Sequence, residues 1–152
     1  MILDPTDIRI LNCIQQDARI SDRKLAELVF KAAPTVHDRL EKLETQGFIK
    51  GYVALLDRAK VGRPVLVVLM VRLKAQNTEL LLEFEGLVRE MPEVQSCLIV
   101  SGNWNFILQV TAATPQDYAI WLLEQINSQS NVGEVQSNFL LKESKNYGAF
   151  SL

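Results

Sequence analysis

The sequence predicts an α+β protein, in which an all-helical N-terminal part precedes a part with the order β-α-β-β-α-β. Before residue 48, apolar residues recur at intervals of three and four, which is the period of amphipathic helices. After residue 64, β-branched and apolar runs alternate with helical patterns, and turn residues separate them. The 152 residues, 48% of them hydrophobic, are enough for the core of one domain or of two small ones.

Three short helices are predicted in the N-terminal part. Asp4 and Ser21 are suitable caps for the first two, and the third runs from about Pro34 to Gln46, where Gly47 ends it. The residues expected to face the core are Ile8, Leu11, Ile14, Leu25, Leu28, Val29, Val36, Leu40 and Leu43, with Ile10 at the edge of the first stripe. A tight turn between the second and third helices is typical of a helix-turn-helix.

Residues 48–56 alternate weakly and are rich in β-formers, which predicts a strand or a small wing. Residues 57–64 contain Lys60, Gly62 and Pro64 and resemble a linker. We therefore expect two domains, a winged helix-turn-helix with its linker over residues 1–63 and a second domain over residues 64–152.

The second domain is predicted to have a ferredoxin-like βαββαβ fold. Strands are expected over residues 65–73, 94–100, 104–111 and 135–141, with one helix capped by Thr78 and another starting at Thr114. The first and third strands are central in this topology, and here they are the most apolar, so the local pattern and the fold agree.

The distribution of charge along the chain favours DNA binding by the N-terminal part. Residues 1–63 hold 11 basic and 9 acidic residues, a net charge of +2, whereas residues 64–152 hold 5 and 9, a net charge of −4. The basic charge thus lies in the half with the DNA-binding pattern.

We expect a cytoplasmic protein without a secretory signal or membrane span, with Cys13 and Cys97 reduced. One histidine without a nearby cysteine argues against a metal site, and no cofactor is expected.

The third helix is predicted to be the recognition helix, with its N-terminal residues nearest the bases of double-stranded DNA. Thr35 and His37 are candidates for base or phosphate contacts, whereas Arg39 and Lys42 would touch phosphate or support the fold. The predicted DNA-binding residues are Lys31, Thr35, His37, Asp38, Arg39, Lys42 and Lys50. The alternative is a solvated helix of mixed charge, because Asp38 and Glu41 are poor neighbours for DNA.

Several stretches, in order and at consistent spacing, resemble the Lrp/AsnC family of feast/famine regulators. They are LD at 3–4 with Asp7 and IL at 10–11, RLEKLE at 39–44, QGFI at 46–49, GY at 51–52, ALLD at 54–57, MPEV at 91–94, VSG at 100–102 and FLLKE at 139–143. The resemblance covers nearly the whole chain. It implies a transcription regulator that forms dimers, which assemble further into rings such as octamers, and that responds to a small molecule, in many relatives an amino acid.

The resemblance also implies an effector site between subunits at the turn of residues 101–105. Backbone N–H groups beside Gly102 can hold a carboxylate. The family's usual aspartate is replaced by Asn105, which can accept a hydrogen bond but carries no charge, so the alternative to an amino acid is a different or neutral ligand. The predicted effector residues are Ser101, Gly102, Asn103, Trp104, Asn105 and Ser137. The alternative is a hairpin turn with a packed tryptophan.

The chain departs from the family in its helix-turn-helix. Phe30 replaces a usual glycine and, if φ is positive there, bears a strain of about 1 kcal/mol. Lys31 replaces an apolar residue, and Ala32 replaces a capping serine, which gives up about 1 kcal/mol. The alternative function is therefore a metabolite-sensing or assembly module with weak or lost DNA binding. An enzyme is not expected, because the sequence has no Ser/His/Asp set and no phosphate loop.

Overall fold

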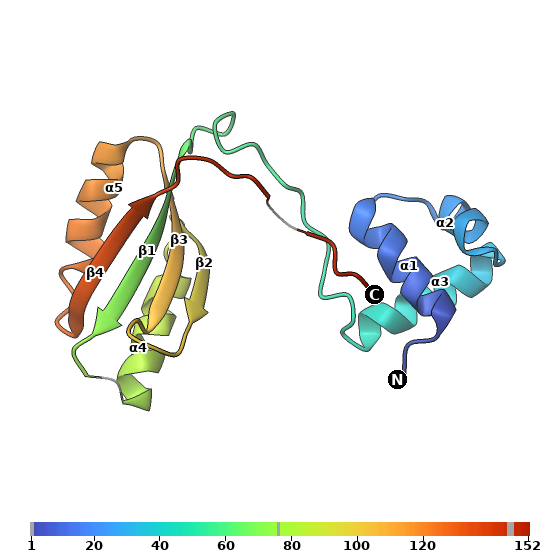
Figure 1. Ribbon diagram of the computed structural model, residues 1–152, viewed down its shortest axis with the longest axis horizontal. Helices are drawn as coiled ribbons and strands as arrows, with labels where there is room; N and C mark the ends of the chain where they lie inside the picture. Colours follow the sequence, from blue (N-terminus) through green and yellow to red (C-terminus); the bar gives the residue numbers. More distant parts are fainter. Residues whose placement is uncertain (1, 76, 146–147) are drawn as a thin grey trace. The chain divides into compact units, whose positions relative to one another are not determined.

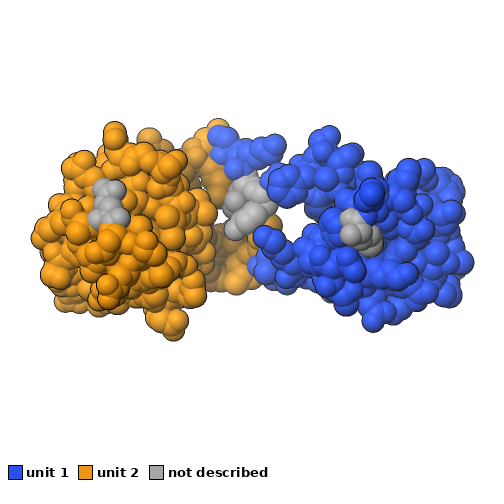
Figure 2. All heavy atoms as spheres, turned by 90° about the horizontal axis from the view of Figure 1, so that it is seen from below, with its two compact units in different colours: residues 1–54, 144–152 blue, residues 55–143 orange. Residues whose placement is uncertain are grey.

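The computed structural model describes residues 2–75, 77–145 and 148–152, and these form two compact units (Figures 1 and 2). The first unit comprises residues 1–54 and 144–152, and the second comprises residues 55–143. These divisions differ from the predicted boundary between residues 63 and 64. The linker residues 55–63 group with the second unit, and the tail groups with the first.

The first unit contains three helices, α1 (Pro5–Gln16), α2 (Asp22–Val29) and α3 (Ala33–Thr45). Asp4 and Ser21 cap α1 and α2 through their side chains, as predicted. The buried core consists of Ile10, Leu11, Leu25, Ala26, Val29, Val36 and Leu43. Ile10 is therefore central to the core rather than at its edge. The prediction for Leu28 was wrong, because this side chain at the end of the short α2 is 46% exposed.

No strand forms in residues 48–56, so the prediction of a strand there was wrong. A strand needs ladder hydrogen bonds to a neighbour, and residues 51–56 have none to another strand in the described part of the chain. The local β-propensity of this segment is not enough to form a strand by itself.

The second unit contains β1 (Val65–Leu73), α4 (Thr78–Arg89), β2 (Val94–Ile99), β3 (Phe106–Ala112), α5 (Pro115–Trp121), the π-helical turn η1 (Leu122–Ile126) and β4 (Val132–Phe139). The sheet is antiparallel with the order β2-β3-β1-β4, which confirms the βαββαβ fold with central first and third strands. The N-cap of α4 is Asn77 rather than the predicted Thr78, since the Asn77 side chain accepts the backbone N–H of Leu80.

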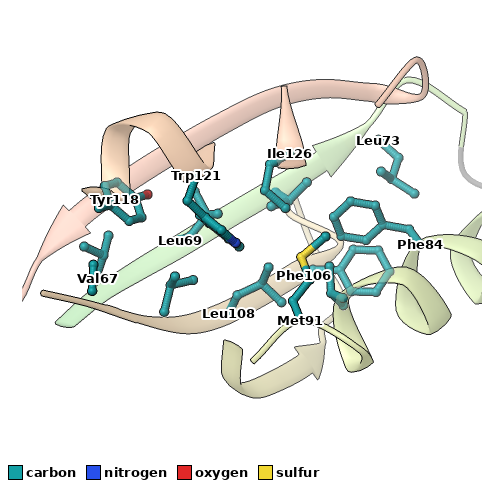
Figure 3. Close-up of a cluster of buried hydrophobic side chains, with 14 residues drawn as sticks. Val67, Leu69, Leu73, Phe84, Met91, Phe106, Leu108, Tyr118, Trp121 and Ile126 are labelled. Atoms are coloured by element: carbon teal, nitrogen blue, oxygen red, sulfur yellow. The ribbon is translucent and has the colours of Figure 1, made fainter. Parts of the chain in front are cut away.

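Both helices of the second unit pack on one face of the sheet. The alternate β1 residues Val67, Leu69 and Val71 are fully buried, in one cluster with Phe84 and Val88 of α4 and with Tyr118 and Trp121 of α5. Figure 3 shows Val67, Leu69, Phe84, Tyr118 and Trp121 of this cluster. The opposite face carries Val68, Met70, Leu98 and Ile107, because successive strand residues point to opposite faces. Leu98 on this uncovered face is 56% exposed.

No helix in the described ranges is long and apolar enough to cross a bilayer. Cys13 and Cys97 are both free thiols, each packed at the edge of the core of its own unit.

Candidate functional site

Helix α3 presents one face to the core and another to solvent. Val36 and Leu43 are fully buried, and Leu40 packs beside them. Thr35, Asp38 and Lys42, at spacings of three and four, lie together on the exposed face, with His37 next to them. Lys31 before the helix and Lys50 after it are also exposed. Six of the seven residues predicted to bind DNA are therefore exposed.

His37 on this exposed face is held by a residue of α2. Its Nδ1 atom lies 2.9 Å from Oδ2 of Asp22. This hydrogen bond, the charge of Asp22 and the nearby charges of Glu41 and Asp38 raise the pKa of His37. The contact fixes the direction of the imidazole ring, and only the three-dimensional packing of α2 on α3 brings the two residues together.

Arg39, the seventh predicted residue, lies on a different face. Its Nη1 atom donates to Asp4 at 2.6 Å and to Asp7 at 2.7 Å. Asp7 is only 4% exposed, so its carboxylate has few other partners. Of the two roles considered for Arg39, the geometry favours support of the fold, because this guanidinium joins α3 to the start of α1.

Asp4 combines the cap of α1 with this ion pair. Its side chain accepts the backbone N–H groups of Thr6 and Asp7, and Asp7 accepts the N–H of Asp4 in return. The hydrogen bond from the Asp7 backbone and the bond from Arg39 lower the pKa of Asp4 to about 2. The sequence predicted the cap, but no local signal indicated that Arg39 would reach it.

The turn between α2 and α3 has the geometry of a helix-turn-helix despite its unusual residues. Phe30 adopts φ 55° and ψ 48°, which confirms the expected positive φ. The N–H of Phe30 donates to Glu27 and the N–H of Lys31 donates to Ala26, which are the two hydrogen bonds of a Schellman motif. Ala32 gives α3 no side-chain cap, as predicted.

The turn predicted to hold an effector is open at its tip and anchored at its base. Ser101, Gly102 and Asn103 are exposed, and Gly102 has φ 115°. Asn105 is only 7% exposed, and its Oδ1 atom accepts the backbone N–H of Leu73 at 2.9 Å. The Asn105 side-chain oxygen is therefore used by the sheet, and Trp104 beside it is half-buried.

Ser137 lies away from this turn within the chain. It pairs with Leu69 in the middle of β1, and its hydroxyl group lies 2.6 Å from that of Tyr118 on the helix-covered face. Burial raises the pKa of Tyr118, and the bond to Ser137 opposes the shift. Of the predicted effector residues, Ser101 to Asn105 therefore lie together in one turn. Ser137 does not contact this turn within the chain and is bonded to Tyr118 of α5.

The described part of the chain contains no cluster of three His, Cys, Asp or Glu side chains that could hold a metal ion. The two candidate sites present hydrogen-bonding and charged groups on an exposed helix in one unit, and hydrogen-bonding groups on an exposed turn in the other.

These features define a DNA-binding regulator with a separate ligand-binding unit, and comparison with known proteins agrees. Residues 3–50 match the family of winged helix-turn-helix DNA-binding domains, and residues 66–150 match the Lrp/AsnC ligand binding domain. The leucine-responsive regulatory protein of Rhizobium meliloti is 34% identical over 143 residues, which are 94% of this chain and 92% of that protein. The Escherichia coli DNA-binding transcriptional activator DecR is 30% identical over 144 residues, which are 95% of this chain and 95% of that protein.

A solved structure is also similar over almost its full length. The transcriptional regulator NMB0573 of Neisseria meningitidis, in complex with L-Met, has a TM-score of 0.92 and 29% identity, over 99% of this chain and 97% of that one. The chain belongs to the Lrp/AsnC family of transcriptional regulators. It is a DNA-binding regulator with a ligand-binding domain, and not an enzyme.

Proposed function

We propose that α3 enters the major groove of an operator, and that an amino acid bound at the turn of residues 101–105 changes this binding. The observation that carries the proposal is the division of α3 into a buried face and an exposed face with Thr35, His37 and Lys42. On this view Thr35 and His37 contact bases or phosphate, and Asp38 lies beside them. Lys31, Lys42 and Lys50 contact phosphate. The protein acts in the cytoplasm, where the DNA is.

The effector part of the proposal rests on the open tip of the turn. The exposed backbone around Gly102 can donate N–H groups to a carboxylate, and Ser101 and Asn103 are free to contribute side-chain bonds. Asn105 and Trp104 support the turn rather than supplying a charge. The L-Met complex of the Neisseria relative makes an amino acid the first ligand to test.

We further propose that the protein is a homo-oligomer, with a dimer as the basic unit and a ring such as an octamer as the assembly. The support is the uncovered sheet face with Val68, Met70, Leu98 and Ile107, since such an apolar face is stabilised when a second copy covers it. A ligand between subunits changes DNA affinity only if it binds two arrangements of the assembly differently. DNA recognition would then belong to residues 1–63 and assembly with effector binding to residues 64–152.

Fluorescence anisotropy on DNA from upstream of the protein's own gene, with unrelated DNA of equal length, tests the proposal. We expect preference for the upstream DNA, weakening with salt, and a shift in affinity with L-methionine or another amino acid. Lys42→Ala should lower the salt slope by about one on both DNAs, whereas Thr35→Ala should reduce the preference between them. Lys142→Ala in the other unit is the control for charge.

Absence of preference at any modest salt would contradict the proposal. It would favour the alternative of a metabolite-sensing module without DNA binding. The intact Schellman turn at Phe30 argues against that alternative, because the turn geometry survives the loss of glycine.

A further inference from the structure

A cavity of about 280 Å³ lies in the second unit, away from the turn of residues 101–105. It is bounded by the end of β3, by α5, by the segment between α4 and β2, and by Arg63 before β1. The turn 101–105 precedes β3, whereas the cavity lies at the residues that end it, so the two sites are at opposite ends of this strand. Ligand pockets for drug-sized molecules begin at about 300 Å³, which makes this cavity suitable for a small metabolite.

The walls of the cavity are mainly apolar and aromatic. Val110 and Ala112 of β3 form one side, and Tyr118 and Trp121 of α5 form the other. All four residues belong to the buried core of the unit, so packing fixes their positions. A pocket with preformed apolar walls is the kind that binds the hydrocarbon part of a small molecule.

Side chains of both positive and negative charge line the same cavity. Arg63 supplies a cation, and Glu93 and Asp117 supply carboxylates. Asp117 uses Oδ2 to accept the hydroxyl of Thr114, which leaves Oδ1 for another partner. In the residues that the structure describes, the side chains of Arg63 and Glu93 form no ion pair.

Trp121 adds an unused hydrogen-bond donor. This residue is 8% exposed, and its indole N–H is the one buried side-chain polar group among the described residues that has no partner (Figure 3). Buried donors in folded proteins are nearly always satisfied, so this unpaired N–H is an exception, and it belongs to a residue that lines the cavity. Its neighbour Tyr118 is satisfied by Ser137.

We propose that this cavity is a second small-molecule site, which binds a zwitterion with an apolar side chain. The carboxylate of the ligand pairs with Arg63 and its ammonium group with Glu93 and Asp117, while the apolar part packs against Tyr118 and Trp121. This site is separate from the effector turn of the proposed function. Because Arg63 belongs to the segment that precedes β1, a ligand here contacts the chain that leads from the DNA-binding unit.

The two tryptophans allow the sites to be observed one at a time. Trp104→Phe leaves Trp121 as the only tryptophan, at the cavity, and Trp121→Phe leaves Trp104, at the turn. We would titrate the full-length Trp104→Phe protein with L-leucine as the probe and record tryptophan emission. The expected result is a saturable change. 3-Methylbutylamine, which lacks the carboxylate, and 4-methylpentanoate, which lacks the ammonium group, should bind at least about tenfold more weakly.

Charge variants on the Trp104→Phe background identify the contacts. Arg63→Ala and Glu93→Gln should each weaken L-leucine binding by about tenfold or more, as expected on loss of a charge-assisted hydrogen bond. Lys60→Ala and Glu90→Gln are the matched controls, because both residues are exposed and neither lines the cavity. Circular dichroism of each variant verifies that it is folded.

Two results would overturn the second site. One is that the emission of Trp121 does not change with L-leucine, and the other is that Arg63→Ala and Glu93→Gln leave the change in emission as it is. The proposed function fails on other grounds, namely absence of preferential DNA binding by the wild type. A response of Trp104 alone in the Trp121→Phe protein would support the effector turn and contradict the cavity.

Discussion

The side-chain oxygen of Asn105 accepts the backbone N–H of Leu73 at 2.9 Å, and the N–H of Asn105 donates to the carbonyl of Val71 at the same distance. These two bonds attach the base of the candidate effector turn to β1. An aspartate at this position would have an oxygen in the same place, so the replacement preserves the attachment while removing a charge.

Asn105→Ala is expected to destabilise the second unit by about 1–3 kcal/mol, because it leaves the Leu73 N–H without its acceptor. Asn103→Ala, in the exposed tip of the same turn, is the matched control and should change stability by less than about 0.5 kcal/mol. Chemical denaturation followed by tryptophan fluorescence measures both. Equal stability of the two variants would show that the bond to Leu73 contributes nothing.

Arg39→Ala is expected to destabilise the first unit by about 2 kcal/mol, since the buried carboxylate of Asp7 loses its partner. The figure is below that of a fully buried pair because the Arg39 side chain is 30% exposed. Arg9→Ala on the exposed face of α1 is the control. Thermal unfolding followed by circular dichroism compares them, and a loss no larger than that of Arg9→Ala would mean that Arg39 does not support the fold.

Phe30→Gly is expected to stabilise the first unit by about 1 kcal/mol, because glycine adopts the left-handed conformation without strain. The ring is 82% exposed, so little packing is lost. Lys31→Gly, one residue further on and outside the positive-φ region, should give no gain. A lower melting temperature for Phe30→Gly would show that contacts of the ring outweigh the backbone strain.

The stability of the first unit should depend on pH, because the carboxyl group of Asp4 has a lowered pKa in the folded protein. The pKa of this carboxyl is about 2 in the folded protein and 3.8 ordinarily, so its contribution is complete above pH 3.8 and is lost as pH falls through about 2. Asp4→Asn retains a capping side chain but removes the charge. Melting curves of the wild type and this variant should differ between pH 7 and 4 and converge towards pH 2. A difference that persists at pH 2 would contradict the assignment.

The order of helices and strands was predictable because each has a strong apolar period. The 3-and-4 spacing in α3 and the continuous run in β1 both proved correct, as did the central positions of β1 and β3. Weak local signals were less reliable. Residues 48–56 have β-propensity but no neighbouring strand, and the cap of α4 lies one residue earlier than expected, where Asn77 competes with Thr78.

The exposed residues of α3 could also be predicted, since the buried positions of a helix define its opposite face. The partners of these residues could not. His37 meets Asp22 and Arg39 meets Asp4 only through the packing of three helices, and Ser137 contacts Tyr118 because β4 turns this residue towards α5. The cavity at Trp121 arises from four separate segments, so no local pattern indicates it.

The tail of residues 144–152 groups with the helical unit, and Gln15 exchanges two hydrogen bonds with the backbone of Phe150, 135 residues away. In order of synthesis, the whole sheet unit is therefore inserted between two pieces of the helical unit. During translation the three helices are made before the sheet unit. The contacts between these helices and the tail of residues 144–152 can form only after β4 has been synthesised. The helical unit is thus completed only after the sheet unit has been synthesised.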